Sequence, residues 1–297
     1  MTQANTQIPG FGLLGHPLGH SMSPFIHQAL FALSGRPQPY ALHDVAPEDL
    51  KTQVPKLLAG QGFNITIPYK EAVMPFLDEV DEKASFFGSV NTVRNENGRL
   101  TGHTTDGDGF LFALAAAGVT AMDRVLLLGS GGASRAMGGT ALLAGAKLIR
   151  IAARSPERAE PLVRDLRTLA ASKGLRCTVE VLPFAAVETD DGSRFDLLVN
   201  GTPVGMHPHT EGCPVSESVI RRCTAVFDAV YNPDETVLLK TAEQLGKTAV
   251  HGIGMLCGQA AAAQELWGIP PCSRSALLAL CRDAVTEMNR RFGEGQG

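Results

Sequence analysis

The feature that most constrains the fold is an apolar run followed at once by a glycine-rich loop. Residues 125–128 (VLLL) are continuously apolar, which is typical of a strand buried on both faces of a parallel sheet. The loop at residues 129–135 (GSGGASR) comes next, and small residues dominate positions 136–144. Strand, glycine loop and helix in this order predict the phosphate-binding turn of a dinucleotide-binding domain.

Two properties of the loop suit it to a phosphate group. Glycine permits the close backbone approach that a pyrophosphate needs, and the first turn of a helix supplies unpaired N–H groups. The residues predicted to contact the cofactor here are Gly129, Gly131, Gly132, Ala133 and Ser134. The alternative is a glycine-rich turn of an α/β domain that binds no nucleotide.

The residues after the next predicted strand indicate which dinucleotide binds. An NAD-binding domain usually has an acidic residue about twenty positions after the loop, at the end of the second strand. This chain has Arg154 there, then Ser155, and Arg158 on a predicted helix. Two guanidinium groups fit a 2′-phosphate, so the three residues are predicted to bind NADP in preference to NAD. The alternative is a pair of solvated arginines.

Strand and helix patterns alternate along the chain. Strands are predicted at residues 11–14, 40–45, 63–67, 90–93, 99–102, 125–128, 148–152, 177–182, 197–200, 226–229 and 248–251. Helices are predicted at residues 25–33, 48–58, 107–117 and 136–144 and in the C-terminal part of the chain. Asn97-Gly98 favours a tight hairpin turn between two of the strands. The strands from residue 125 onward, with helical or turn segments between them, indicate a doubly wound sheet.

Composition excludes several classes of protein. The chain of 297 residues is 44% hydrophobic and carries a net charge of -4, which argues against a nucleic-acid-binding surface. Its six cysteines lack the spacing of zinc ligands or redox pairs. The first charged residue is Arg36, so no secretion signal is expected, and the apolar runs are too short to span a membrane. We expect a soluble cytoplasmic protein.

Residues 64–70 (NITIPYK) suggest one wall of a polar pocket. Alternation along a strand would place Asn64 and Thr66 on one face, while Pro68 favours a turn that opens a helix at Lys70. A lysine in such a place can be tuned for proton transfer. The alternative is an ordinary edge strand followed by a solvated lysine.

Several motifs together resemble the shikimate dehydrogenase family, and the resemblance covers nearly the whole chain. Besides the glycine loop, they are residues 15–24 (GHPLGHSMSP), 64–70 (NITIPYK), 89–92 (SVNT), 104–107 (TTDG), 200–206 (NGTPVGM), 228–233 (DAVYNP) and 252–259 (GIGMLCGQ). Their order and spacing make the combination far more specific than any single motif.

The resemblance implies NADP-dependent reduction of 3-dehydroshikimate to shikimate, a step in making aromatic amino acids. Lys70 and Asp106 occupy its catalytic positions, where they would handle the proton of the carbonyl oxygen that hydride transfer converts to an alkoxide. The substrate-binding positions are Ser21 and Ser23 for the carboxylate, Asn64, Thr66, Asn91 and Gln259 for the ring hydroxyls, and Tyr231 for the carboxylate or the ring face. The further cofactor positions are Thr202, Met206 and Gly252.

The resemblance also implies a two-domain α/β fold. The expected domains are a substrate-binding and catalytic α/β domain at residues 1–107, a Rossmann-type doubly wound NADP-binding domain at 108–250, and C-terminal helices at 251–297 that pack back on the substrate domain. The implied partner is the small-molecule substrate, with neither nucleic acid nor membrane, and the protein is expected to be a monomer or a homodimer.

Three positions depart from the family pattern or bear on specificity. Thr104 stands where the family has asparagine, and Ala153-Arg154-Ser155 replaces the usual Asn-Arg-Thr, so NAD is the alternative cofactor. Ser23 matches the shikimate-type loop better than the threonine often found in quinate-oxidising relatives. A quinate/shikimate dehydrogenase that uses NAD or NADP is therefore the alternative activity.

Other interpretations compete with the enzyme hypothesis. His16, His20 and His27 invite a metal site, but their spacing belongs to a loop that runs into a helix, and we predict no metal. Asp106 alone would serve as a helix cap. A non-catalytic relative that binds a cyclohexene acid or a nucleotide is the alternative class, and the presence of both Lys70 and Asp106 weighs against it.

Overall fold

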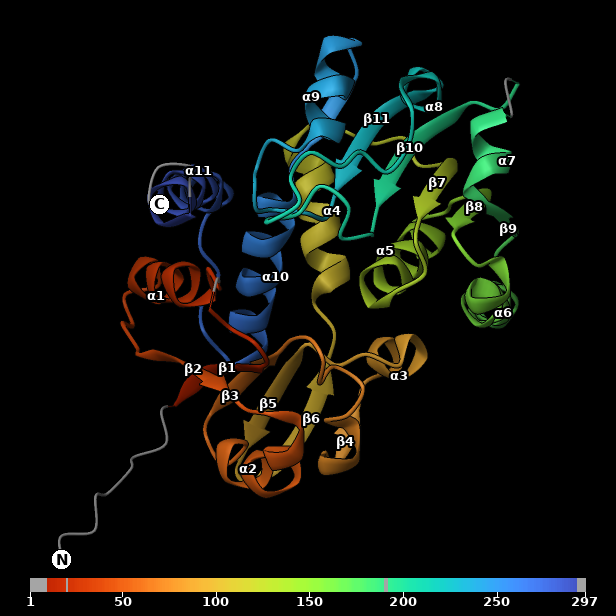
Figure 1. Cartoon of the computed structure of the whole chain (residues 1–297). Coiled ribbons are helices and arrows are strands. Elements are labelled where there is room, and N and C mark those ends of the chain that lie inside the picture. The colour runs from red at the N-terminus through yellow and green to blue at the C-terminus, as the bar shows by residue number, and fades with distance from the viewer. Residues whose placement is uncertain (1–9, 20, 190–191, 293–297) are drawn as a thin grey trace, which may run out of the picture. The chain divides into compact units, whose positions relative to one another are not determined.

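The computed structural model describes residues 10–19, 21–189 and 192–292 (Figure 1). The chain forms two compact units, Met1–Thr105 with Ala260–Leu280 and Asp106–Gln259 with Cys281–Gly297. The sequence predicts one C-terminal segment, 251–297, whereas the structure assigns only 260–280 to the first unit. No helix among the described residues is long and apolar enough to cross a membrane.

The first unit contains a mixed six-stranded sheet in the order β2-β1-β3-β5-β6-β4. Its strands are β1 (Phe11–Gly15), β2 (Tyr40–Asp44), β3 (Gly62–Ile65), β4 (Glu79–Val80), β5 (Thr92–Glu96) and β6 (Arg99–His103). β1 pairs in parallel with β2 and β3, whereas β5 runs antiparallel to both β3 and β6. The parallel part therefore carries the N-terminal β–α alternation that the sequence predicts.

Helices cover both faces of this sheet. They are α1 (Ser23–Leu33), α2 (Leu50–Leu57) and α3 (Glu82–Phe87), with α1 and α2 on opposite sides (Figure 1). Neighbouring residues of β1 show why, since Leu13 packs with the α1 residue Phe31 and Leu14 with the α2 residue Val54. Side chains of a strand alternate between faces, so one apolar run supplies two cores.

The predicted hairpin is confirmed, because β5 and β6 are joined at Asn97-Gly98. Asn97 has φ 54° and Gly98 has φ 90°. Positive φ at both positions is the requirement of the tightest hairpin turn, and Asn-Gly meets it with little strain. The local chemistry of two residues thus sets this register.

The predicted helix at Lys70 is wrong. Residues 70–73 form turns, and a short 3-10 helix follows at Met74–Phe76. Pro75 explains the difference, because it has no N–H to donate to the carbonyl of Glu71 and so cannot continue an α-helix. Met74 N–H donates to that carbonyl instead, at 3.1 Å. The predicted strand is also shorter, since β3 ends at Ile65.

The second unit contains a six-stranded parallel sheet in the order β12-β11-β10-β7-β8-β9. Its strands are β7 (Arg124–Leu128), β8 (Leu148–Ala153), β9 (Thr178–Pro183), β10 (Phe195–Asn200), β11 (Cys223–Asp228) and β12 (Thr248–Val250). The order reverses between β7 and β10, which is the doubly wound arrangement. The predicted α/β fold class is confirmed.

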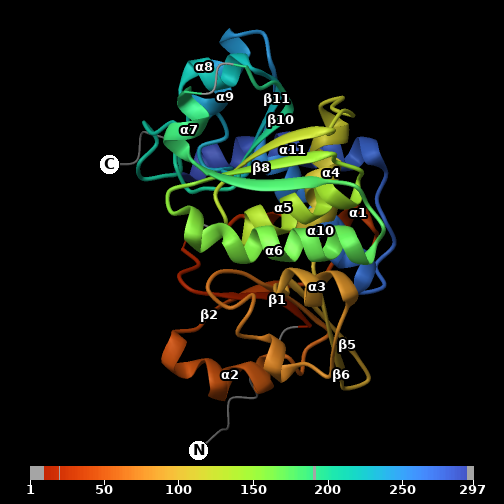
Figure 2. The same cartoon turned by 90° about the vertical axis from the view of Figure 1, so that its right-hand side faces the viewer.

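Eight helices accompany the second half of the chain. They are α4 (Asp106–Ala116), α5 (Gly132–Leu143), α6 (Pro156–Ser172), α7 (Phe184–Thr189), α8 (Glu217–Arg221), α9 (Val237–Gln244), α10 (Gly252–Leu266) and α11 (Arg274–Phe292). Leu126 packs with α7, α8 and α9 on one face of the sheet, and α5 and α6 run side by side (Figure 2). Leu127, on the other face, lies beside Gly138 of α5.

Candidate active site

The glycine loop adopts the predicted strand–turn–helix geometry. β7 ends at Leu128, Gly129 follows with φ 90°, and α5 begins at Gly132. A side chain at Gly129 would lie 2.9 Å from Cγ2 of Thr202, whereas none would meet an atom within 4 Å at Gly131 or Gly132. The first glycine is thus needed for the turn, and the next two leave the N-terminus of α5 open to an anion.

Ser134 and Thr202 line the back of this turn. Ser134 is fully buried, and a side chain at Gly201 would lie 2.2 Å from its Oγ. Thr202 donates its hydroxyl to Oδ1 of Asn200 at 2.7 Å. The loop after β10 therefore packs against the loop after β7, at the point where the strand order reverses and where such folds bind ligands.

The two predicted phosphate-binding arginines lie at the end of β8. Arg154 follows the last strand residue, Ser155 precedes α6, and Arg158 lies in its first turn. Both guanidinium groups are exposed, and neither has an ion-pair or hydrogen-bond partner within the ranges that the structure describes. Two unpaired guanidinium groups beside the phosphate turn suit a 2′-phosphate.

The remaining predicted cofactor residues lie on neighbouring loops of the second unit. Ala133 lies in the first turn of α5, and Met206, 45% exposed, lies on the loop after β10. Gly252 begins α10, where a side chain would lie 2.6 to 2.9 Å from the carbonyl oxygens of residues 228–230. Glycine at 252 is therefore required by packing against the end of β11, apart from any contact with a cofactor.

Ser21 and Ser23 stand at the N-terminus of α1. Ser23 N–H donates to Oγ of Ser21 at 3.2 Å, and both residues are half-buried. Met22, at the N-cap position, makes no side-chain capping bond. Two hydroxyls beside the positive end of a helix dipole suit a carboxylate, which agrees with the role that the resemblance implies.

Thr66 and Lys70 lie on the loop that leaves β3. Thr66 N–H donates to the carbonyl of Leu14 at 2.9 Å, and a side chain at Gly15 would lie 2.4 Å from Cγ2 of Thr66. Val90 N–H donates to the carbonyl of Lys70 at 2.8 Å. The loop is thus fixed to the end of β1 and to the segment that leads to Asn91.

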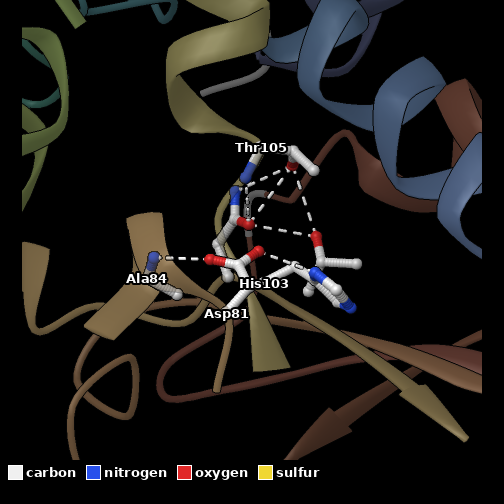
Figure 3. Close-up of polar contacts among 6 residues, drawn as sticks. Asp81, Ala84, His103 and Thr105 are labelled. Atoms are coloured by element: carbon white, nitrogen blue, oxygen red, sulfur yellow. Dashed lines mark hydrogen bonds and ion pairs between the residues drawn. The ribbon is translucent and has the colours of Figure 1, made fainter. Parts of the chain in front are cut away.

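A buried hydrogen-bond network surrounds Asn91 (Figure 3). Its Oδ1 accepts from Thr105 N–H at 2.8 Å and from the Thr92 hydroxyl at 3.0 Å, and its Nδ2 donates to the Thr105 hydroxyl at 3.1 Å. These two bonds occupy both lone pairs of Oδ1. Oδ1 of Asn91 is therefore engaged by the network itself.

Asn64 belongs to the same network. Its Nδ2 donates to the Asn91 carbonyl at 3.2 Å and to the Thr92 hydroxyl at 3.1 Å, and its Oδ1 accepts from the Tyr40 hydroxyl at 2.8 Å. Both amide hydrogens are in use, so one lone pair of Oδ1 remains for a ligand. This geometry favours support of Asn91 as the main task of Asn64, and its predicted contact with a ring hydroxyl stays a prediction.

His103 and Asp81 form an ion pair at the end of β6 (Figure 3). Nδ1 of His103 lies 2.7 Å from Oδ2 of Asp81, and Oδ1 of Asp81 accepts from Ala84 N–H at 2.7 Å, which caps α3. Although burial raises the pKa of Asp81, the hydrogen bonds from His103 and Ala84 lower it below its usual value. Asn91 N–H donates to the His103 carbonyl at 3.0 Å, so the pair stabilises the strand beside Asn91.

The other predicted residues lie in the second unit. Asp106 is buried and begins α4, directly after Thr105 in the chain. Tyr231 follows the end of β11, where burial raises its pKa, and Gln259 lies on α10. Because Lys70 belongs to the first unit and Asp106 to the second, their pairing stays a prediction.

Several supporting residues do not stand out in the sequence. Tyr40, Thr92 and Thr105 hold Asn64 and Asn91, and Asn200 and Asp228 hold the loops of the second unit. Four of them lie inside the quoted motifs, which could have marked them, whereas Tyr40 lies outside every motif. Thr104, the departure from the family pattern, is buried with an Oγ1 that has no hydrogen-bond partner among the described residues.

A metal site finds no support in the part of the chain that the structure describes, where no group of three or more His, Cys, Asp or Glu side chains could hold an ion. His16 pairs with Asp44 at 2.6 Å. His27 is buried and stacked on Tyr40. His20 lies outside the described residues.

Comparison with known proteins extends the match to most of the chain. The family model of the shikimate dehydrogenase substrate-binding domain matches residues 13–93. The NADP(+) shikimate dehydrogenase of Caldanaerobacter subterraneus subsp. tengcongensis is 41% identical over 260 residues, which are 86% of this chain and 90% of that protein.

Solved structures agree with the sequence relatives. Shikimate 5-dehydrogenase from Thermus thermophilus, in complex with NADP(H) and shikimate, matches with TM-score 0.80 and 33% identity over 92% of this chain and 98% of that one. Quinate dehydrogenase from Corynebacterium glutamicum, in complex with NAD, matches with TM-score 0.82 and 32% identity over 92% and 98%. With identity of this order over nearly the full length, the chain belongs to the shikimate dehydrogenase family.

Proposed function

We propose that this protein is an NADP-dependent shikimate dehydrogenase, which reversibly reduces 3-dehydroshikimate to shikimate in aromatic amino acid biosynthesis. The observation that carries the proposal is the similarity to a relative named NADP(+) shikimate dehydrogenase. The two sequences are 41% identical, and the match covers 90% of that relative. The unpaired Arg154 and Arg158 beside the glycine turn support NADP in particular.

In this function cofactor and substrate are held by different sets of residues. NADPH, held by the glycine turn, Thr202, Met206, Gly252 and the Arg154 segment, supplies the hydride. The hydroxyls of Ser21 and Ser23 hold the substrate carboxylate, and Asn91 binds a ring hydroxyl. Thr66, Gln259 and Tyr231 complete the contacts with the substrate.

Lys70 and Asp106 handle the proton. As hydride reaches the carbonyl carbon, negative charge develops on the oxygen, and the Lys70 ammonium donates a proton to it. A carboxylate at Asp106 orients the ammonium and stabilises its charged form. In the reverse direction the neutral amine accepts the hydroxyl proton of shikimate.

The same proposal assigns residues 1–107 to the substrate, 108–250 to NADP and 251–297 to helices that complete the substrate domain. It places the enzyme in the cytoplasm as a monomer or homodimer. These assignments follow from the resemblance to the family.

Initial rates of the purified protein with shikimate or quinate, each with NADP+ or NAD+, test the proposal. We expect the highest kcat/KM for shikimate with NADP+, since Ser23 matches the shikimate-type loop and Arg154 favours the 2′-phosphate. A higher kcat/KM for quinate with NAD+ would assign the chain to the quinate branch of the family. If none of the four pairs yields reduced nicotinamide, the result would contradict the proposal that the protein is an enzyme.

A further inference from the structure

Two buried polar side chains meet at the carboxyl ends of β10 and β11. β10 and β11 are neighbouring strands (Figure 1), and Asn200 and Asp228 occupy paired positions in them. Nδ2 of Asn200 donates to Oδ1 of Asp228 at 2.9 Å, and both residues are fully buried. Neither residue is among those expected to touch substrate or cofactor, so their purpose needs a separate explanation.

The Asn200–Asp228 pair is connected to the phosphate turn through Thr202. Oδ1 of Asn200 accepts from Thr202 N–H at 3.0 Å and from the Thr202 hydroxyl at 2.7 Å. Thr202 in turn lies against Gly129, since a side chain at 129 would be 2.9 Å from its Cγ2. The Asn200 amide can make these bonds only in one orientation, because its Nδ2 must face the carboxylate of Asp228. The carboxylate therefore sets the orientation of the amide that holds Thr202.

Asp228 itself holds the segment after β11. Its Oδ1 also accepts from Val230 N–H at 3.0 Å, and its Oδ2 accepts from the Thr236 hydroxyl at 2.7 Å. Thr236 caps α9, where its Oγ1 accepts from Leu239 N–H at 3.3 Å. The Asp228 carboxylate thus holds the segment that contains Tyr231 at two points, the Val230 N–H before it and the Thr236 hydroxyl after it.

Retaining a carboxylate here is costly. Burial raises the pKa of Asp228 to about 6, even though the hydrogen bonds from Thr236, Val230 and Asn200 and the charge of His251 lower it. A buried carboxylate whose charge has to be compensated by several hydrogen-bond donors contributes little to the stability of the fold. A role in holding the neighbouring loops explains its presence better than stability does.

We propose that Asp228 is a positioning residue of the dehydrogenase reaction, acting through Asn200 on Thr202 at the phosphate turn and through Val230 on the Tyr231 segment. This inference rests on the proposed function. It assigns Asp228 no contact with substrate or cofactor. Its effect on NADP is carried by one orientation of the Asn200 amide.

The first part of the proposal is the action of Asp228 through Asn200 on Thr202. The affinity of the purified protein for NADP+, measured by isothermal titration calorimetry, tests it. Asp228→Ala and Asn200→Ala each remove the restraint on Thr202, and we expect each to weaken NADP+ binding about tenfold, as loss of an oriented hydrogen bond does. Asp228→Asn should stay within about threefold of wild type, because its Oδ1 still accepts from Asn200 and Val230 while its Nδ2 donates to the Thr236 hydroxyl.

Two control variants separate positioning from stability. Val226→Ala destabilises the same strand, because Val226 is fully buried two residues before Asp228, but it breaks none of these bonds. Thr236→Val removes the partner of Oδ2 and the side-chain cap of α9, but it leaves the bonds of Asn200 with Asp228 and Thr202 in place. We expect both to bind NADP+ within about threefold of wild type. Weakening by Val226→Ala equal to that by Asp228→Ala would overturn the proposal, as would unchanged affinity in both Asp228→Ala and Asn200→Ala.

The second part of the proposal is the action of Asp228 through Val230 on the Tyr231 segment. Steady-state kinetics test it, and they distinguish its failure from a failure of the proposed function. Asp228→Ala should raise KM for both NADP+ and shikimate, whereas Asn200→Ala should raise mainly KM for NADP+, and Asp228→Asn should restore both constants. If the wild type binds NADP+ but does not oxidise shikimate, the proposed function fails and the calorimetric comparison still decides the role of Asp228. A wild type that does not bind NADP+ overturns both. Should Asp228→Ala not fold, Asn200→Ala alone decides the first part.

Discussion

At the scale of single residues, the site is defined as much by supporting side chains as by those that would meet a ligand. Lys70, Asn91 and the glycine loop stand out in the sequence because their residue types suit proton transfer, hydrogen bonding to a substrate hydroxyl and phosphate binding. Tyr40 and Asp228 do not stand out, because a tyrosine or aspartate near a strand end is ordinary until its partners are known. The sequence marks the contact residues, and the structure adds the residues that orient them.

Tyr40 offers a direct test of the network around Asn91. Tyr40→Phe removes the hydroxyl that donates to Oδ1 of Asn64, which leaves a buried acceptor unpaired at a cost of about 1–3 kcal/mol in the free energy of unfolding. We also expect kcat/KM for shikimate to fall about tenfold, because Asn64 orients Asn91. Steady-state kinetics and urea unfolding measure the two effects.

Tyr69→Phe is the matched control for that variant. The Tyr69 hydroxyl donates to the Val45 carbonyl at 2.5 Å, within the same unit, but it has no bond to Asn64. Its loss should lower stability while leaving kcat/KM within about twofold of wild type. An equal fall in kcat/KM in both variants would contradict a specific role of the network.

The proposed contact of Arg154 with the 2′-phosphate would favour NADP+ over NAD+. Arg154→Ala removes a charged donor to the 2′-phosphate, and hydrogen bonds to charged groups are worth about 1.5–3 kcal/mol. We therefore expect KM for NADP+ to rise about tenfold or more and KM for NAD+ to change less than about twofold. Arg164→Ala removes the same charge farther along α6 and serves as the control. Equal effects of Arg154→Ala on both cofactors would contradict the phosphate contact.

At the scale of elements, strands and turns follow from local sequence more closely than helix starts do. The VLLL run is β7, and Asn97-Gly98 joins β5 to β6 as predicted. The predicted helix at Lys70 is wrong because Pro75 interrupts it. The helix predicted at residues 48–58 divides into a 3-10 turn at Pro47–Asp49 and α2. Such boundaries depend on individual hydrogen bonds, which periodicity does not specify.

The contact between β3 and the segment after α10 was not predictable from either element alone. A side chain at Gly62 would lie 2.4 to 2.6 Å from the indole of Trp267, whose Nε1 donates to the Val93 carbonyl at 3.0 Å. Gly62→Ala should therefore lower the free energy of unfolding by about 1–3 kcal/mol through overpacking. Gly10→Ala, whose side chain would meet only the Gln61 side chain at 3.4 Å, is the control. Urea unfolding curves of equal midpoint for both variants would contradict the tight contact.

At the scale of the whole molecule, one buried group in each unit gives the free energy of unfolding an opposite dependence on pH. In the first unit, burial lowers the pKa of His27 to about 3, so the unfolded chain binds more protons below its ordinary value of 6.5. The free energy of unfolding therefore decreases, as far as His27 determines it, when the pH falls below 6.5. In the second unit, burial raises the pKa of Asp228 from 3.8 to about 6. The native state then binds more protons, and stability falls as the pH rises from 3.8 through 6.

His27→Phe isolates the first of these effects. The phenyl ring preserves an aromatic partner for Tyr40, which lies 4.2 Å away in a stacked arrangement, and it does not titrate. Between pH 7 and pH 5 the free energy of unfolding should fall by about 2 kcal/mol more in wild type than in the variant. Urea unfolding at both pH values gives this difference. Parallel pH dependence in the two proteins would show that His27 is not buried in its neutral form.

The doubly wound sheet and the family were predictable because many motifs agree over the full length of the chain. The boundary between the units was less accessible, since residues 260–280 join the first unit through contacts such as that of Trp267 with Val93. Long-range packing of this kind leaves little trace in local composition. The proposed joint action of Lys70 and Asp106 was predictable only through the resemblance to the family, since the two residues belong to different units.

The turnover number of Lys70→Ala with shikimate and NADP+ is the most direct test of the proposed mechanism. We predict that it falls at least about a hundredfold while KM for shikimate stays near the wild-type value, because proton transfer is lost and binding is largely kept. Lys56→Ala, on the exposed side of α2, should leave turnover unchanged. An unchanged turnover number in Lys70→Ala would contradict the mechanism.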